Sequence, residues 1–133
     1  MKILFICRAN VGRSQIATAF FNKLSKKHES IGAGTHVNEK EGDPLHEFVI
    51  KCMNEMDYDL SKNKRKQLTP KMVEWADKII VMTEEDNLPS YINMSKVIFW
   101  KIEDAKDRSL EFHRKIRYQI KSLVEELLVS INN

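Results

Sequence analysis

The amino-acid sequence predicts an α/β protein in which helices cover both faces of a parallel sheet. Short, continuous apolar runs, such as residues 3–6 and 78–82, are typical of strands that are buried on both faces. Stretches with apolar residues at helical spacing alternate with these runs along the chain. Such alternation is characteristic of strand–helix–strand units, whose strands pair in parallel.

The first elements form half of such a unit. Residues 3–6 are the expected opening strand, residues 7–12 a short polar loop, and residues 13–27 a helix with apolar side chains at helical spacing. Residues 30–35 are expected to form a weaker strand, which ends in a glycine turn at residues 32–34.

The rest of the chain continues the pattern. Asp43 and Pro44 predict the start of a helix that runs to about residue 56, because aspartate suits the N-cap and proline the first helical position. Thr69 and Pro70 repeat this signature before a short helix. Two further buried strands and a long amphipathic helix are expected at residues 78–82, 97–100 and 110–131.

Length and composition favour one small protein domain. The 133 residues fit a single domain over residues 1–133. A net charge of +3 is too mild to indicate a nucleic-acid partner, and the densest basic run, residues 62–66, is interpreted as solvated surface that can also attract an anionic substrate. No stretch approaches the length of a signal segment or a membrane span. We therefore expect a cytoplasmic monomer that binds neither nucleic acid nor membrane.

The two cysteines, Cys7 and Cys52, provide neither a disulfide framework nor a set of zinc ligands. They fit a reducing compartment. We interpret Cys52 as a helix residue without a redox role.

The loop after the first strand carries the expected chemistry, because residues 7–14 contain a cysteine, five intervening residues, an arginine and a serine. This spacing lets the main chain curl into a cup with N–H groups directed inward, which is an anion-binding arrangement. The helix that begins at the cup adds free N–H groups and a favourable dipole. Arg13 offers a planar pair of donors that matches two phosphate oxygens.

The same positive field favours the thiolate form of Cys7, which is the form that attacks phosphorus. Ser14 is expected to donate a hydrogen bond to that thiolate. The alternative, a structural cysteine at the end of a strand, is disfavoured because the motif lies directly between a buried strand and a helix. The residues expected to bind phosphate on this basis are Arg8, Ala9, Asn10, Val11, Gly12 and Ser14.

With these residues the chain resembles the low-molecular-weight protein tyrosine phosphatase family, which also includes thioredoxin-coupled arsenate reductases. The resemblance extends over essentially the whole chain and rests on residues 7–14, 32–36, 66–69, 75–82 and 100–104. It implies a four-stranded parallel sheet flanked by helices on both faces. It also implies hydrolysis of a phosphorylated protein or a small phosphomonoester through a phosphocysteine, without a metal or other cofactor.

The resemblance also supplies a general acid. In the family an aspartate in the late loop protonates the departing oxygen, and Asp104 matches its position; Asp107 is the alternative. Asp104 follows the last expected strand, at the sheet edge where the nucleophile lies. Cys7, Arg13 and Asp104 are therefore the expected catalytic residues.

Four departures from the family pattern affect the details. Ala105 stands where the family usually has proline, so the loop is expected to be more mobile, and Lys106 and Asp107 replace aromatic residues. Gly12 replaces a cysteine that often precedes the arginine, which leaves the nucleophile without a resolving partner. Residues 83–89 contain neither of the further cysteines that thioredoxin-linked arsenate reductases use.

The histidines are expected to be peripheral. His36 and His46 fall near the second loop at the active edge of the sheet, and a structural or solvent-facing role is favoured over the alternative of substrate contact. His28 and His113 are interpreted as helix-surface residues.

Three functions are compatible with these residues. The first is a phosphomonoester hydrolase, with protein phosphotyrosine as the expected substrate. The second is an arsenate reductase that uses Cys7 with an external small thiol. The third is a phosphate-binding module without turnover, which is disfavoured because binding alone needs neither a nucleophile nor an acid.

Overall fold

The computed structural model describes residues 1–132 and, within them, forms one four-stranded parallel sheet with the strand order β2-β1-β3-β4. Residue 133, the last of the expected domain, lies outside the described residues. The strands are β1 (Lys2–Cys7), β2 (Glu29–Gly34), β3 (Lys78–Val81) and β4 (Val97–Phe99). The prediction of a four-stranded parallel sheet is therefore confirmed.

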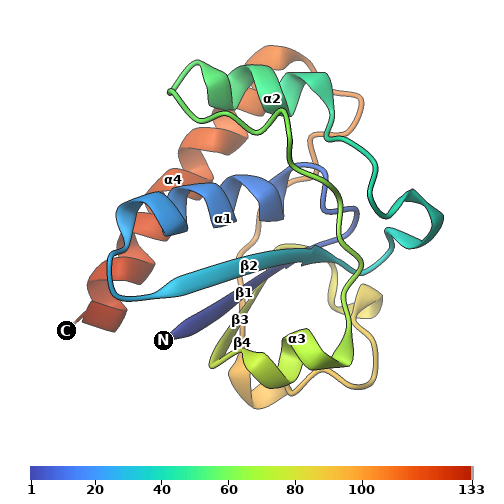
Figure 1. Cartoon of the computed structure of the whole chain (residues 1–133), viewed down its shortest axis with the longest axis vertical. Coiled ribbons are helices and arrows are strands. Elements are labelled where there is room, and N and C mark those ends of the chain that lie inside the picture. The colour runs from blue at the N-terminus through green and yellow to red at the C-terminus, as the bar shows by residue number, and fades with distance from the viewer. Residues whose placement is uncertain (133) are drawn as a thin grey trace.

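Helices cover both faces of this sheet (Figure 1). The four α-helices are α1 (Arg13–Leu24), α2 (Glu47–Asn54), α3 (Pro70–Trp75) and α4 (Leu110–Asn132). Helices α1, α2 and α4 lie on one side of the sheet, and α3 lies on the other. The side chains of β1 show this, because Phe5 packs in the core cluster of α1, α2 and α4, whereas Ile6 packs in the cluster that contains residues of α3. Single turns of 3-10 helix lie in the connecting loops, at η1 (Asn38–Lys40), η2 (Glu85–Asn87) and η3 (Met94–Lys96).

Because all strands run in parallel, their carboxyl ends meet at one edge of the sheet. The nucleophile loop, which we define as residues 7–14, leaves β1 at that edge and leads directly into α1, as the sequence predicts. Strand β1 begins, and helix α4 ends, at the opposite edge (Figure 1). Among residues 1–132, no helix combines the length and the apolar character that a membrane crossing requires.

The predicted start of the second long helix is wrong. Asp43 and Pro44 are extended rather than helical, because they pair with the segment at Lys64 and Arg65: Pro44 bridges Lys64, and Arg65 N donates to Asp43 O at 3.0 Å. Helix α2 begins only at Glu47 and ends at Asn54.

Two further expectations differ from the structure. Helix α1 ends at Leu24 rather than near residue 27, because Ser25 is already extended. Strand β4 is expected to be buried but lies at the sheet edge, where Ile98 is 39% and Phe99 47% exposed. A strand at the edge of a sheet has a neighbouring strand on one side only, so its side chains are covered less completely than those of a central strand.

Candidate active site

The loops at the carboxyl edge of the sheet surround a cleft of about 460 Å³. Its walls come from the nucleophile loop, from residues 36–40 after β2, and from the acid loop, which we define as residues 101–107 after β4. His46, Arg65 and His113 complete the wall. The cleft thus brings Cys7, Arg13 and Asp104 together, although they are far apart in the sequence.

The nucleophile loop forms the floor of this cleft. Cys7 is 2% exposed at the end of β1. Asn10 has a positive φ of 52°, the left-handed conformation that the curl of the loop requires and that asparagine tolerates. In the part of the chain that the structure describes, the N–H groups of residues 9–14 have no protein acceptor. A row of free N–H groups at the start of a helix is an anion-binding arrangement.

A chain of hydrogen bonds fixes the orientation of the side chains beneath the sulfur. Lys66 N donates to Asn10 Oδ1 at 2.8 Å, and because a main-chain N–H can only donate, the other end of the Asn10 amide must be the NH₂ group. That group donates to Ser14 Oγ at 2.6 Å. Ser14 Oγ in turn lies 2.9 Å from Cys7 Sγ.

Gln15 and Asn63 extend this network, and neither is among the residues expected from the sequence. Gln15 Nε2 donates to Asn10 Oδ1 at 2.8 Å, and Asn63 Nδ2 donates to Gln15 Oε1 at 3.1 Å. The basic run at residues 62–66 is therefore more than solvated surface, since it anchors the loop and contributes Arg65 to the cleft wall. No sequence signal indicates this role, because it depends on the pairing of distant segments.

Two glycines let β2 approach the nucleophile loop closely. A Cβ on Gly34 would lie 2.8 Å from both Arg8 O and Asn10 N, and one on Gly32 would lie 2.7 Å from Thr18 Oγ1. Both residues are part of β2 and pair with β1, so the turn expected at residues 32–34 is wrong. The glycines serve a close main-chain approach instead of a change of chain direction.

Arg13 connects three parts of the site. Its side chain is 10% exposed, and its guanidinium donates to Met82 O after β3 and to Ile102 O, at 3.0 Å, in the acid loop. The same guanidinium lies 3.7 Å from the carboxylate of Asp104, whose side chain is 51% exposed. Arg13 is thus held by main-chain carbonyls while part of its charge faces the cleft.

The remaining expected residues lie around the cleft in different ways. Ala9, Val11 and Gly12 line it, and so does Asp107, the alternative acid. Arg8 also lines it, and its guanidinium donates to Asn87 Oδ1 at 3.2 Å, which adds a second contact between the nucleophile loop and the segment after β3.

The histidines divide differently from the prediction. His36 and His46 line the cleft, as their position near the second loop indicates. His113 is not on the surface: it is 6% exposed and lines the same cleft. The signal for this was present, since His113 precedes Ile116 and Ile120 at the spacing of the buried face of α4.

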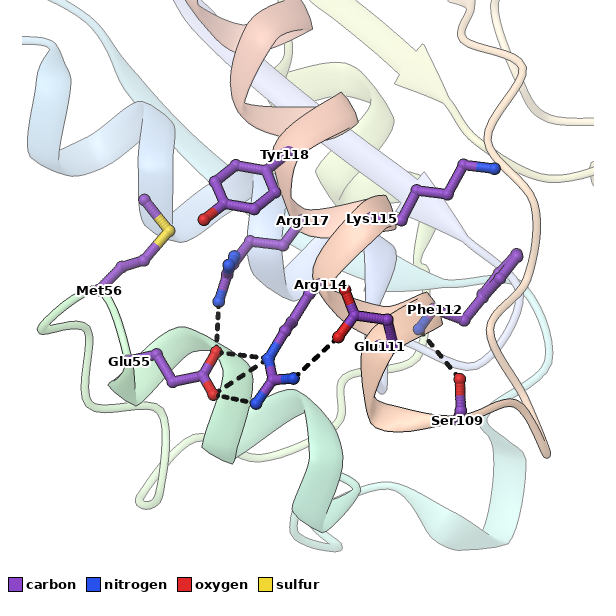
Figure 2. Close-up of a pocket in the computed structure, with 9 residues that line it drawn as sticks. All are labelled: Glu55, Met56, Ser109, Glu111, Phe112, Arg114, Lys115, Arg117 and Tyr118. Carbon is purple, nitrogen blue, oxygen red and sulfur yellow. Dashed lines mark hydrogen bonds and ion pairs between the residues drawn. The ribbon is translucent and has the colours of Figure 1, made fainter.

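A second, more open hollow of about 870 Å³ lies between α2 and α4 (Figure 2). Most of its charged groups are paired with one another: Glu55 accepts from Arg114 at 2.7 Å and from Arg117 at 2.7 Å. Neither Cys7 nor Cys52 lines the hollow. Within residues 1–132, no cluster of three or more His, Cys, Asp or Glu side chains is arranged to hold a metal ion.

The chain as a whole is similar to known proteins. The family model described as "Low molecular weight phosphotyrosine protein phosphatase" matches residues 2–133. Two relatives are 29% identical and match 98% of this chain: a Halobacterium salinarum protein provisionally named as an arsenate reductase, of which 93% is covered, and the glutaredoxin arsenate reductase of Synechocystis, of which 98% is covered.

Solved structures share the fold. The low molecular weight protein tyrosine phosphatase from T. tengcongensis superimposes with a TM-score of 0.87 at 24% sequence identity, over 98% of this chain and 99% of that one.

Proposed function

Because the chain belongs to the low molecular weight phosphotyrosine protein phosphatase family, we propose that it hydrolyses phosphomonoesters through a phosphocysteine on Cys7. The observation that carries this proposal is the position of the sulfur, which lies 2.9 Å from the Ser14 hydroxyl at the floor of a loop whose N–H groups have no acceptor within the described residues. A sulfur anion and a phosphate group are both stabilised at such a place.

In the first step the Cys7 thiolate attacks phosphorus in line with the ester oxygen. The S–P bond forms, the P–O bond breaks, and Asp104 transfers its proton to the departing oxygen. Arg13 and the N–H groups of the loop hold the other three phosphate oxygens, over which the charge of the transition state spreads. Support for these roles comes from the shared cleft, and from the 3.7 Å between the Arg13 and Asp104 side chains.

In the second step water attacks the phosphocysteine. Asp104, now a carboxylate, accepts a proton from that water, the S–P bond breaks, and Cys7 leaves as a thiolate. Ser14 assists here by donating a hydrogen bond to the departing sulfur anion, 2.9 Å from its hydroxyl oxygen. The products are inorganic phosphate and the free enzyme, so atoms and charges balance over the cycle.

The substrate class is proposed from the cleft wall. Among the described residues that line it there is no Phe, Tyr or Trp, and the rings that line it are the imidazoles of His36, His46 and His113. Lys40, Arg65 and Lys106 give the rim a positive charge, while Glu39 and Asp107 add negative charge. We propose protein phosphotyrosine as the substrate within the phosphomonoester class. Small alkyl and aryl phosphates are compared with it in the same assay.

The test is turnover of p-nitrophenyl phosphate by the wild type, Cys7→Ser and the matched control Cys52→Ser. Cys52 lies in α2, outside the cleft. We expect the first variant to lose measurable turnover and the control to retain it. Wild-type activity in Cys7→Ser would overturn the proposal, and tight phosphopeptide binding without phosphate release by the wild type would favour a binding module instead.

Arsenate reduction is the second candidate, because both relatives at 29% identity are named for that activity. Arsenate has the shape and charge of phosphate, so the Cys7 thiolate can form an S–As bond as water leaves. An external small thiolate then attacks the Cys7 sulfur, and the S–S bond of a mixed disulfide forms as the S–As bond breaks. Arsenic keeps the bonding electron pair and leaves as arsenite, so the two sulfurs are oxidised and arsenic(V) is reduced to arsenic(III). A second molecule of the small thiol releases Cys7 from the mixed disulfide. Arsenite production that depends on added glutathione, and is lost in Cys7→Ser, would favour this activity.

A further inference from the structure

The wall of the cleft carries more positive than negative charge. It includes five arginine and lysine side chains and three carboxylates. Arg13 faces Asp104 and is assigned to the phosphate group. The proposed reaction gives no role to the other four cationic side chains, which are Arg8, Lys40, Arg65 and Lys106. A cation that the fold holds in one place beside the nucleophile can bind a further part of the substrate.

Arg65 is held in this way at both its main chain and its side chain. Its segment runs beside residues 42–44 (Figure 1). Gly42 N donates to Arg65 O at 2.9 Å, and Arg65 N donates to Asp43 O at 3.0 Å. The guanidinium is fixed to the same segment, because Arg65 Nε donates to Pro44 O at 3.0 Å.

This attachment leaves the terminal nitrogens of the Arg65 guanidinium available. An arginine has one N–H on Nε and two on each terminal nitrogen. Within residues 1–132 the terminal N–H groups of Arg65 have no protein acceptor, and no carboxylate forms an ion pair with it. The side chain is half-buried and borders the cleft. A planar pair of donors in such a place matches the two oxygens of a carboxylate.

Arg8 is the alternative, but its surroundings are less favourable for an anion. One of its terminal nitrogens donates to Asn87 Oδ1 at 3.2 Å, so its planar pair is partly used. The three residues directly before Asn87, at positions 84–86, are all acidic and repel an anion. Arg65 belongs instead to the basic run at residues 62–66, whose charge attracts one.

The two lysines of the wall differ from Arg65 in their neighbours. Lys40 follows Glu39 in the sequence, and Lys106 precedes Asp107; both acidic residues line the cleft as well. The residues on both sides of Arg65 are lysines. An anion at the cleft wall is therefore attracted most strongly beside Arg65, where the guanidinium is also fixed in orientation.

We propose that the guanidinium of Arg65 is a subsite for a second anionic group of the substrate, so that the enzyme prefers phosphotyrosine segments with an acidic side chain close to the phosphorylated residue. This inference rests on the proposed function and narrows its substrate class. The phosphate group occupies the nucleophile loop, and the neighbouring carboxylate lies against the wall to which Arg65 belongs. The second contact strengthens binding and takes no part in the bonds that form or break.

Peptide binding to the full chain with Cys7→Ser tests this subsite without turnover. The probes are phosphotyrosine peptides of one neutral host sequence, with a single glutamate placed in turn at each of the three positions on either side of the phosphotyrosine. Glutamine at the same position is the reference. We expect the glutamate peptide to bind about fivefold more tightly for at least one position, which is the upper range for an ion pair that water partly screens. Salt at about 0.5 M should remove most of this preference.

Arg65→Gln, combined with Cys7→Ser, should reduce the preference to less than about twofold. A loss of phosphate affinity that is common to both peptides cancels in the ratio, so a disturbed nucleophile loop cannot produce this result. Lys62→Gln is the matched control, because it removes the same charge from the same basic run at an exposed side chain that does not line the cleft. It should keep the preference. Arg65→Glu should reverse it, in favour of a peptide with lysine at that position.

Four results would overturn the subsite. They are equal binding of glutamate and glutamine peptides at every position, an unchanged preference in Arg65→Gln, an equal loss of preference in Lys62→Gln, and no measurable binding of any phosphopeptide. The proposed function fails by a different observation, which is a wild type that hydrolyses no phosphomonoester. That outcome would leave the preference for acidic peptides measurable by binding.

Discussion

The side-chain amide of Asn10 donates a hydrogen bond to the Ser14 hydroxyl oxygen at 2.6 Å, which leaves the hydroxyl hydrogen free for a second partner. When Cys7 is a thiolate, that partner is Cys7 Sγ, 2.9 Å away, because a sulfur anion can only accept. A hydroxyl that donates to a sulfur anion stabilises it. The stabilisation matters both when the thiolate attacks phosphorus and when it has to leave.

Ser14→Ala should therefore slow catalysis without preventing binding. A hydrogen bond to a charged group is worth roughly 1.5–3 kcal/mol, so we expect kcat to fall about 10- to 100-fold. KM should change little, because the N–H groups of the loop remain. Rapid-quench measurements should show more phosphorylated enzyme at steady state than in the wild type. Ser90→Ala, on the exposed surface, is the control; a wild-type kcat in Ser14→Ala would contradict the role of the hydroxyl.

Asp104→Asn tests the general acid by leaving group. Asparagine can still accept the hydrogen bond that Lys106 N donates at 3.0 Å, so the local turn is preserved while the proton is lost. For phenyl phosphate we expect kcat to fall by about 10²–10⁴, the usual contribution of general acid catalysis. For p-nitrophenyl phosphate the loss should be much smaller.

The same series on Asp107→Asn separates the two candidate acids, since Asp107 also lines the cleft. If Asp107→Asn rather than Asp104→Asn shows the dependence on leaving group, Asp107 is the acid. Losses that are equal across leaving groups in both variants would leave neither with that role.

The parts of the site that can be predicted from the sequence are those that one short segment specifies. The strand, loop and helix of residues 2–24 follow from an apolar run, a motif with fixed spacing and a helical pattern, and each is local. The resemblance to a family adds Asp104 by position. Single-domain organisation, a monomeric state and a cytoplasmic location remain predictions.

The parts that could not be predicted depend on how distant segments pair. Pro44 has the sequence signature of a helix start, but a bridge to Lys64 makes the segment extended. Gln15 has no local signal for its bond to Asn63. His113 was misplaced for a different reason, since its spacing on α4 indicates the buried face while its residue type indicates the surface.

Replacing the β2 glycines should distort the nucleophile loop from behind. A Cβ at residue 34 would lie 2.8 Å from main-chain atoms of Arg8 and Asn10, which cannot move without the loop. A Cβ at residue 32 would lie 2.7 Å from the Thr18 hydroxyl, which is a side-chain group, and its nearest main-chain atom would be Ser14 O at 3.1 Å. Gly34→Ala should therefore lower the free energy of unfolding by about 1–3 kcal/mol, and Gly32→Ala by less.

Urea unfolding and phosphatase activity together check this prediction. We expect the kcat of Gly34→Ala to fall more than that of Gly32→Ala when both variants are assayed well below their unfolding midpoints. Equal stability of Gly34→Ala and the wild type would mean that β2 can move away from the loop at no cost.

Glu55 makes the stability of the folded protein depend on pH in the acid range. Hydrogen bonds from Arg114 and Arg117 lower the pKa of its carboxyl from 4.5 to about 2 (Figure 2). The folded protein therefore binds this proton more weakly than the unfolded chain does. The stabilisation is fully present above pH 4.5 and is lost as the pH falls towards 2.

Glu55→Gln should accordingly be less stable than the wild type at pH 7, because it removes the charge that faces Arg117, a side chain that is only 3% exposed. The difference between the urea midpoints of the two proteins should shrink between pH 4.5 and 2, where the wild-type carboxylate becomes protonated. Glu111→Gln is the matched control on the same cluster, since Glu111 pairs with Arg114 alone and its side chain is 83% exposed; it should barely shift the midpoint. A difference for Glu55→Gln that stays constant over this pH range would show that the glutamate acts through packing and not through its charge.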